Sequence, residues 1–283
     1  MVSPLLAKAA PEGREIVNVT PARAGWRYVG FRAIRLKTGE KESLNTGTNE
    51  LCLVVLTGTV DVTVDGETFA HLGTRNSVFE PVAPAAVFVP SGQAVGITAS
   101  RDAEVALCTA PAGKDAREAP RAVRVIDPAS MRRSVRGAGS NTRYVCDILP
   151  HDDPTADHLL VVEVITPAGH SSSYPPHKHD RETPPTETQL EETYYHRLNP
   201  PQGFAFQRVY TDDRSLDEAC AVEDHDVVMV PRGYHPVVAP HGYDLYYLNV
   251  MAGPNRFWVF RNDPAHEWML ANPPTPYAPS KAS

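Results

Sequence analysis

The chain has 283 residues, a formal net charge of −7 and no cluster of basic residues. This length suits two domains of about 100–150 residues each, and the charge argues against partners such as nucleic acids and anionic membranes. Charged residues or prolines interrupt each apolar run before the ~20 residues that a membrane-spanning helix needs. The N-terminus lacks the basic start and long apolar region of a signal peptide, so we expect a cytoplasmic protein.

The first half of the chain predicts a β-barrel. The 27 prolines, together with the lack of long segments of helical period, favour strands joined by rigid turns. After residue 50, valines alternate with polar residues in TVDVTVDG before an Asp-Gly pair, which is the pattern of a β-hairpin. Further short apolar runs follow at residues 86–90, 95–100 and 104–109, so we expect one antiparallel barrel over roughly residues 20–112.

The second half repeats this organisation. Residues 111–143 are rich in Ala, Gly, Arg and Pro and are predicted to connect two domains. Strand-like runs then follow at residues 143–149, 158–166, 192–198, 204–210, 226–230 and 243–251, with one short helix over 264–270. The sequence therefore predicts an internal duplication, with an N-terminal barrel over 1–120 and a C-terminal barrel over 121–283. The four cysteines have no CxxC spacing and are interpreted as free buried thiols.

Histidines are concentrated in the second half. His71 is the only one before residue 150, and the other ten lie between residues 151 and 266. His177 and His179 are two positions apart, so on an extended strand both imidazoles point to the same face. His235 follows a Pro-Arg-Gly turn. The first barrel has no such pair of histidines, and we expect a structural role for it, as a cover for the second barrel or an oligomer interface.

An HxH pair, a later glutamate and a histidine after a Pro-x-Gly turn resemble, in this order, the ligand pattern of cupins. Three imidazoles and a carboxylate suit one divalent ion of Zn, Mn, Fe, Co or Ni, among which we favour Zn or Mn. The gap between His179 and Glu192 is longer than is usual in cupins. Glu182, Glu187 and Glu191 therefore compete with Glu192 for the fourth position.

Longer segments resemble one family more closely, and the resemblance is strongest over residues 172–268. The segments are SSYPPHKHD, LEETYYHR, NPPQGFAFQRVYTDDRSLDEA, VPRGYHPVVAPHGYDLYYLNVMAGP and NDPAHEW. They are similar to the 5-deoxyglucuronate isomerases of bacterial inositol catabolism, which are themselves similar to the ketol-isomerase of pectin breakdown. The resemblance implies an all-β bicupin fold of two antiparallel double-stranded β-helix (jelly-roll) barrels with few short helices.

The resemblance also implies a site and an activity. The metal ligands would be His177, His179, Glu192 and His235, because the glutamate of the related ketol-isomerase directly precedes a Val-Tyr-Phe strand, as Glu192 precedes a Thr-Tyr-Tyr segment here. The implied reaction is the aldose–ketose isomerisation of 5-deoxy-D-glucuronate to 5-dehydro-2-deoxy-D-gluconate.

Two side chains are candidates for proton transfer. Tyr194 and His196 share the strand face of Glu192 by the period of two, so we expect them to line the pocket in catalytic roles. Lys178, between His177 and His179, should point away from the pocket.

Two more side chains are candidates for binding a sugar acid. Arg208 shares a strand face with aromatic residues and could hold a carboxylate through two parallel hydrogen bonds. The alternative is that its guanidinium pairs with an acid such as Asp212. Tyr246 or Tyr247 is expected to contribute a hydroxyl to the pocket, and Tyr246 is the one predicted to bind the substrate. Because adjacent strand residues point to opposite faces, only one of the two can do so.

Other functions remain open from the sequence. A metal-dependent cupin dioxygenase could use the same ligand set, and a non-catalytic protein could bind the sugar acid as a sensor. A sensor should carry a DNA-binding helix-turn-helix, and we find no such segment in the sequence. The expected partner is a small sugar acid, with no nucleic acid and no membrane. Exposed sheet edges favour a homodimer or higher homo-oligomer.

Overall fold

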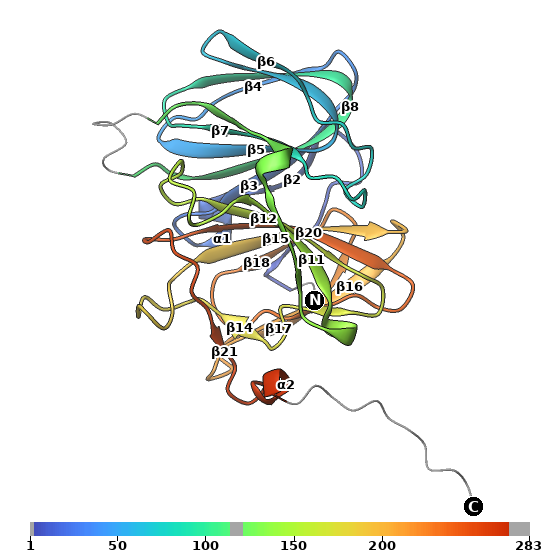
Figure 1. The fold of residues 1–283 in the computed structure, drawn as a ribbon, viewed down its shortest axis with the longest axis vertical. Coiled ribbons are helices and arrows are strands. Elements are labelled where there is room, and N and C mark those ends of the chain that lie inside the picture. Colours follow the sequence, from blue (N-terminus) through green and yellow to red (C-terminus); the bar gives the residue numbers. More distant parts are fainter. Residues whose placement is uncertain (1–2, 114–120, 272–283) are drawn as a thin grey trace, which may run out of the picture.

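The structure is a computed structural model that describes residues 3–113 and 121–271. Figure 1 shows two β-barrels, one above the other along the long axis. The α-helices of the described residues are the four-residue segments α1 (Pro21–Ala24) and α2 (Trp268–Ala271). The prediction of two antiparallel barrels with few short helices is therefore confirmed. None of the described helices is long and apolar enough to cross a membrane.

The first barrel is an antiparallel sheet that starts at β2. Its strands are β2 (Glu15–Val19), β3 (Gly30–Leu36), β4 (Lys41–Asn45), β5 (Asn49–Val64), β6 (Glu67–Leu72), β7 (Ala85–Val89), β8 (Ala94–Pro111) and β9 (Arg124–Ile126). The predicted hairpin joins β5 to β6, and Asp65 and Gly66 both have positive φ, as a tight hairpin turn requires. The apolar runs predicted as separate strands at 95–100 and 104–109 form the single strand β8.

The second barrel consists of two main sheets. The larger has the order β1–β18–β15–β20–β12–β11–β10, and the smaller has the order β13–β19–β16–β17. Their bounds are β1 (Leu6–Ala7), β10 (Arg132–Arg136), β11 (Arg143–Leu149), β12 (Leu160–Thr166), β13 (Ser171–Ser172), β15 (Glu191–Asn199), β16 (Phe204–Tyr210), β17 (Asp217–Glu223), β18 (Val227–Val230), β19 (Val237–Val238) and β20 (Asp244–Ala252). A two-stranded ribbon of β14 (His177–Lys178) and β21 (Arg261–Asn262) covers one end.

Two short strands cross between the predicted domains. β1 pairs with β18 of the second barrel, whereas β9 pairs with β7 of the first. The segment predicted as a bare connection, 111–143, thus contains β9 and β10, and that interpretation is wrong in those places. The boundary at residue 120 falls in 114–120, outside the described residues, so the division into 1–120 and 121–283 stays a prediction. The predicted helix over 264–270 is shorter, since only residues 268–271 are helical.

Two carboxylates connect the barrels reciprocally. Glu191, at the start of β15, accepts hydrogen bonds from the backbone N–H groups of residues 27–29, directly before β3. Glu50, near the start of β5, accepts three from residues 157–159, directly before β12. Because β5 and β15 hold equivalent places in the two sheets, Glu50 corresponds to Glu191. The next residue in each strand is then Leu51 in the first barrel and Glu192 in the second.

Apolar packing completes the interface and fills the first barrel. Phe31 of β3 stacks on Tyr195 of β15 with 5.2 Å between ring centroids, inside a cluster shared by both barrels. Leu51 packs in a second cluster made only of first-barrel residues. The first barrel therefore has a hydrocarbon interior where the second has polar side chains, and this fits a structural role.

Candidate metal centre

Three imidazoles and one carboxylate converge inside the second barrel. The ligand atoms of His177, His179 and His235 lie within 4.8 Å of one another, and all three residues are buried. Glu192 Oε2 lies 3.2 Å from His179 Nε2 and 3.2 Å from His235 Nε2. The structure thus brings together all four residues predicted as ligands.

Local backbone geometry places His235. The preceding Gly233 has φ +92°, and a Cβ at this position would lie 2.4 Å from the carbonyl oxygen of Tyr210. Only glycine fits this turn, because other residues rarely adopt that φ and would also collide with the neighbouring strand. The Pro-Arg-Gly turn therefore directs His235 inward, with 0% of its surface exposed.

Backbone carbonyls orient the imidazole rings. His179 Nδ1 donates to the carbonyl of Leu190 at 3.1 Å, and His235 Nδ1 donates to the carbonyl of Gly233 at 2.9 Å. These bonds place the proton on Nδ1 and leave the Nε2 lone pairs facing the cluster. Such outer hydrogen bonds fix the tautomer of metal-binding histidines.

Burial and mutual repulsion govern the charge of the cluster. Burial, with the nearby His235 and His179, lowers the pKa of His177 well below its usual value. Burial also lowers the pKa of His235 to about 4. For His179, burial lowers the pKa, but the hydrogen bond and charge of Glu192 outweigh it, so the pKa is raised. His177 and His235 are therefore neutral near pH 7, which is the form that binds metal ions.

The four side chains fit a divalent ion. The buried Nε2 of His235 has no hydrogen bond to any described residue, although a buried polar atom without a partner is costly. Three imidazole nitrogens and one carboxylate oxygen are a donor set that Zn, Mn, Fe, Co and Ni accept. A cation between these atoms would satisfy His235 and offset the negative charge of Glu192.

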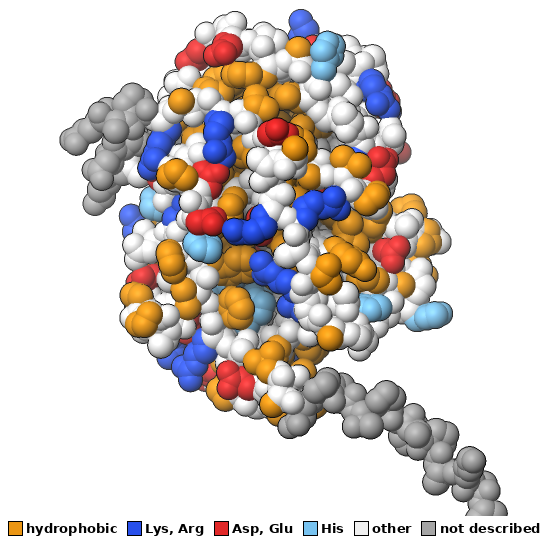
Figure 2. All heavy atoms as spheres, in the orientation of Figure 1, with side chains coloured by type: hydrophobic (Ala, Val, Ile, Leu, Met, Phe, Trp, Pro, Cys, Tyr) orange, Lys and Arg blue, Asp and Glu red, His pale blue; other side chains and the backbone are white. Residues whose placement is uncertain are grey.

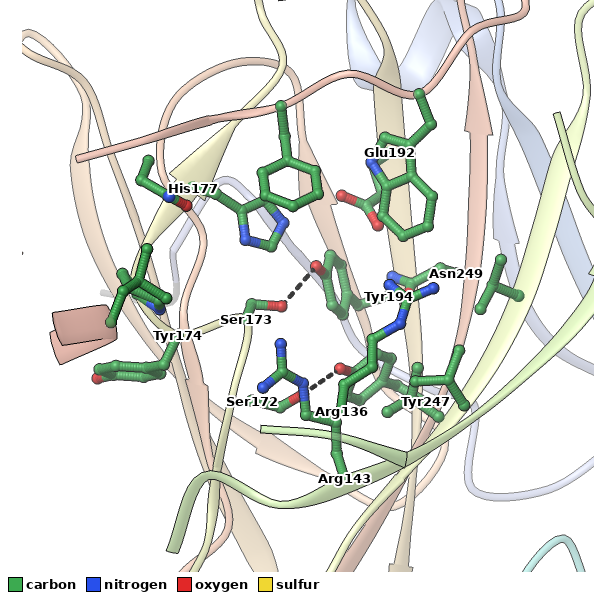
Figure 3. Close-up of a pocket in the computed structure, with 18 residues that line it drawn as sticks. Arg136, Arg143, Ser172, Ser173, Tyr174, His177, Glu192, Tyr194, Tyr247 and Asn249 are labelled. Carbon is green, nitrogen blue, oxygen red and sulfur yellow. Dashed lines mark hydrogen bonds between the residues drawn. The ribbon is translucent and has the colours of Figure 1, made fainter. Parts of the chain in front are cut away.

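The cluster borders a cavity of about 320 Å³, near the lower end of the range for small-molecule sites. Figure 3 shows His177 and Glu192 on one side of this cavity, with Ser173 and Tyr194 below them. Its lining comes mainly from β10, β11, β12, β15 and β20 and from the segment before β14: Arg136, Arg143, Val145, Val162, Val164, Ser172, Ser173, Tyr174, Pro175, His177, Glu192, Tyr194, Tyr247, Asn249, Trp258, Phe260, Asn262 and Leu270.

Of the two predicted catalytic residues, one lines the cavity. Tyr194 is buried, its hydroxyl lies 3.3 Å from Ser173 Oγ, and burial, with Glu192 and Tyr247, raises its pKa well above the usual value. His196 shares the inward face as predicted but lies behind Tyr194, stacked on its ring, with Nε2 bonded to Gln207 at 3.0 Å. The expectation that His196 lines the pocket is therefore wrong, because Tyr194 covers it.

Arg208 does not reach the cavity. β16 alternates as predicted, but Phe204, Phe206 and Arg208 occupy its exposed face. Arg208 forms two hydrogen bonds of 2.7 Å with Asp217. The predicted substrate role is thus wrong for this cavity, and the alternative of an acid-paired arginine holds, with Asp217 in place of Asp212.

Tyr246 is also on the wrong face. It is fully buried between the barrels, and its hydroxyl donates to Glu163, which pairs with Arg75 of the first barrel. The adjacent Tyr247 lines the cavity instead and bonds to Ser172 Oγ at 2.5 Å. Alternation along β20 therefore decides between the two tyrosines in favour of Tyr247.

The competing glutamates are engaged elsewhere. Glu191 faces the first barrel, and Glu187 accepts hydrogen bonds from the backbone N–H groups of residues 180 and 181. Glu182 accepts from Gln189 N and Asn255. Lys178 points away from the cluster, as predicted, and pairs with acidic residues at positions 180 and 212. Glu192 is thus the glutamate that the structure places beside the histidines.

Sequence reasoning missed several lining residues. Ser172 and Ser173 lie four to five positions before His177, and this closeness was a usable signal. Arg136 lies on β10, in a stretch interpreted as a connection, and Arg143 lies at its end, as the first residue of the predicted strand that forms β11; neither was connected with the site. Asn249 carries no pattern beyond its place in an apolar strand.

Known proteins resemble the chain over most of its length. Residues 5–269 match the KduI/IolB family. A 5-deoxy-glucuronate isomerase of Geobacillus thermodenitrificans (strain NG80-2) is 51% identical over 92% of this chain and 92% of its own. The protein of that name from Bacillus subtilis (strain 168) is 48% identical over 92% of this chain and 97% of its own.

Solved structures agree with the fold. An IolB-like protein from Salmonella typhimurium LT2 superposes with a TM-score of 0.90 at 48% identity, covering 94% of this chain and 99% of that one. An oxalate decarboxylase from Lactobacillus farciminis superposes with a TM-score of 0.64 at 15% identity, covering 96% and 92%, and shares the fold alone. Fold and site together define a bicupin whose second barrel carries a three-histidine, one-glutamate cluster. The chain belongs to the KduI/IolB family.

Proposed function

We propose that this protein is a metal-dependent aldose–ketose isomerase that converts 5-deoxy-D-glucuronate to 5-dehydro-2-deoxy-D-gluconate in myo-inositol catabolism. The observation that carries the proposal is the similarity, at about half of all positions and over 92% of the chain, to proteins named 5-deoxy-glucuronate isomerase. The cluster of His177, His179, His235 and Glu192 beside a sugar-sized cavity supplies suitable chemistry.

The reaction moves hydrogen within one molecule. The carbon next to the aldehyde loses a hydrogen, and its hydroxyl loses a proton as it becomes the ketone. The aldehyde carbon gains the hydrogen, and its oxygen gains a proton to become a primary alcohol. Atoms and charge balance without an oxidant, a reductant or water, so the reaction needs only groups that position the substrate and move protons.

Side chains of the cavity can hold the reacting oxygens. Tyr194 keeps its phenolic proton, because burial raises its pKa, and can therefore donate a hydrogen bond to the carbonyl oxygen as negative charge develops there. Ser173 lies beside the Tyr194 hydroxyl, and the hydrogen-bonded hydroxyls of Ser172 and Tyr247 form a second polar pair at the cavity wall. These donors orient the substrate and stabilise charge on its oxygens.

The metal would be held by His177, His179, Glu192 and His235. A bound divalent ion supplies Lewis-acid polarisation of an oxygen ligand. The carbonyls of Leu190 and Gly233 would keep two of the imidazoles in the tautomer that binds it. We favour Zn or Mn, and elemental analysis of the isolated protein identifies the ion.

The test is direct conversion of the aldehyde substrate by the purified protein, followed by carbon NMR. We expect the aldehyde signal to be replaced by that of a ketone. The variant His177→Ala should lose both bound metal and turnover, while His225→Ala, outside the cluster, should keep both. No conversion after loading with each of the five metals would refute the proposal, and full activity without metal would refute its metal dependence.

Two further expectations accompany the proposal. A homodimer or higher homo-oligomer is tested by light scattering coupled to size-exclusion chromatography. The cytoplasmic location is tested by fractionation of cells that express the protein.

A further inference from the structure

Arg143 lines the cavity with much of its hydrogen-bonding capacity unused. Its Nη1 donates to the main-chain and side-chain oxygens of Asn141, at 3.1 and 3.2 Å. A guanidinium has five N–H donors, so three remain, on Nε and Nη2. Among residues 3–113 and 121–271, no other acceptor bonds to Arg143, and no carboxylate lies within 4.0 Å of it.

Two other buried arginines of this protein, Arg75 and Arg197, each have an acid partner, whereas Arg256 donates to main-chain carbonyls. Arg75 forms two hydrogen bonds with Glu163, at 3.1 and 2.9 Å, and Arg197 forms two with Glu104, at 2.9 and 2.8 Å. Arg143 is partly buried, and this burial, with the nearby charge of Arg136, lowers its pKa. A desolvated cation without a counter-charge is unfavourable, so an anion entering the cavity would be stabilised there.

A second guanidinium stands at the same wall. Arg136, at the end of β10, lies over the ring of Trp258 at 5.4 Å, and its Nη2 is 3.9 Å from Asp147, too far for a hydrogen bond. In Figure 3, Arg136 and Arg143 rise into the cavity from the β10–β11 side, and His177 and Glu192 lie beyond Tyr194. Figure 2 shows several basic side chains, with acidic ones beside them, across the middle of this face. This wall of the cavity thus carries two guanidinium groups that have no hydrogen bond to a carboxylate of the described residues.

We propose that Arg143, assisted by Arg136, binds the carboxylate of the sugar acid and thereby directs its carbonyl end toward the histidine cluster. This inference rests on the proposed function for the identity of the acid. The planar fork of a guanidinium matches both oxygens of a carboxylate, and such charge-assisted pairs are among the strongest hydrogen bonds in proteins. The arginine side of the cavity then binds the carboxylate, and the reacting carbons of the substrate lie near the histidine cluster.

This arrangement predicts selection against neutral sugars. A sugar of the same length that ends in a hydroxymethyl group leaves the donors of Arg143 without an anionic partner. A site built for a polar group rejects analogues that lack it, because its buried polar atoms then stay unpaired. Binding of the carboxylate at a fixed point also limits how far the sugar can shift along the cavity. This favours the position in which its first two carbons can react.

The experiment compares two sugars and three variants. The sugars are 5-deoxy-D-glucuronate, which ends in a carboxylate, and 5-deoxy-D-glucose, which has a hydroxymethyl group at that position and is otherwise identical. Arg143→Met should lower kcat/KM for the uronate by about 100-fold, mainly through KM, as the loss of two charge-assisted hydrogen bonds implies. The neutral sugar should be turned over equally by wild type and variant. Arg143→Lys should give an intermediate loss, and Arg208→Met, an exposed arginine outside the cavity, should change nothing.

A binding measurement separates this inference from the proposed activity. Calorimetry uses the non-reactive alcohol obtained by reducing the aldehyde of the substrate, with bound metal quantified for each protein. We expect Arg143→Met to bind this acid about 100-fold more weakly with unchanged metal content. If wild type binds the acid in this Arg143-dependent way but turns over no uronate, the proposed function fails and the inference stands.

Three results would overturn the inference. They are an equal loss on both sugars, undiminished uronate turnover in Arg143→Met, and binding of the reduced acid that does not depend on Arg143. Should Arg143→Met fail to fold, Arg143→Lys and Arg136→Met carry the same comparison. Both must then lower the preference for the uronate over the neutral sugar.

Discussion

Glu191 and Glu192 are neighbours on β15 whose replacement should alter different properties. Glu191 points to the first barrel, and Glu192 points to the histidine cluster. We predict that Glu191→Gln lowers the free energy of unfolding while metal binding is kept. Glu192→Gln should instead abolish metal binding with little loss of folding stability, because Gln has nearly the same volume and the variant removes a buried charge.

The size of the first effect follows from the hydrogen bonds. Glu191 Oε1 accepts from Arg27 N at 2.7 Å, and Oε2 accepts from Tyr28 N at 2.6 Å and Val29 N at 3.0 Å. In Glu191→Gln the uncharged amide oxygen can still accept from two of the backbone N–H groups. The amide NH₂ group faces the third N–H, and two donors cannot form a hydrogen bond with each other. Weakening two charged hydrogen bonds and leaving one buried N–H unpaired should cost about 2–4 kcal/mol.

The assay is urea unfolding followed by tryptophan fluorescence, with metal content measured on the same samples. Glu50→Gln is the matched variant, because Glu50 accepts three backbone hydrogen bonds of 2.7 Å each from the second barrel. It should be destabilised to a similar degree. A loss below about 0.5 kcal/mol in both variants, or loss of metal in Glu191→Gln, would refute the reasoning.

Further predictions concern the tyrosines and His196. Tyr194→Phe should lower kcat by about 10- to 100-fold with little change in KM, as measured by steady-state kinetics. Tyr195→Phe should keep kcat, because the Tyr195 hydroxyl bonds to Glu104 in the interface between the barrels. Burial lowers the pKa of His196 to about 4, so the unfolded chain takes up a proton between about pH 6.5 and 4 that the folded chain does not. His196 should contribute up to about 3 kcal/mol to the loss of stability of the metal-free protein across that window, so the loss should be smaller in His196→Gln, as pH-dependent urea midpoints would show.

Several elements could be predicted because they depend on local chemistry. The alternation of valines before Asp65-Gly66 produces a hairpin wherever one face of a strand is buried, and the HxH spacing places His177 and His179 on one side. Period-two reasoning also placed Tyr194 and His196 on the face of Glu192. The same reasoning could not tell which face of β16 is inward, because aromatic residues occur on exposed faces too, and Phe206 is 50% exposed.

What the sequence by itself determined is the class of fold and the three histidines that can bind a cation, with several glutamates from which the resemblance to known isomerases selected Glu192. Strand periodicity, turn residues and the order of histidines and glutamate are properties of short segments, and short segments suffice to state them. What only the tertiary structure decided is the wall of the cavity: Tyr247 lines it and Tyr246 does not, Tyr194 lies in front of His196, and Arg136 and Arg143 line it where Arg208 does not. These choices depend on which strands become neighbours when the sheet closes, and contacts between residues a hundred positions apart leave no local pattern.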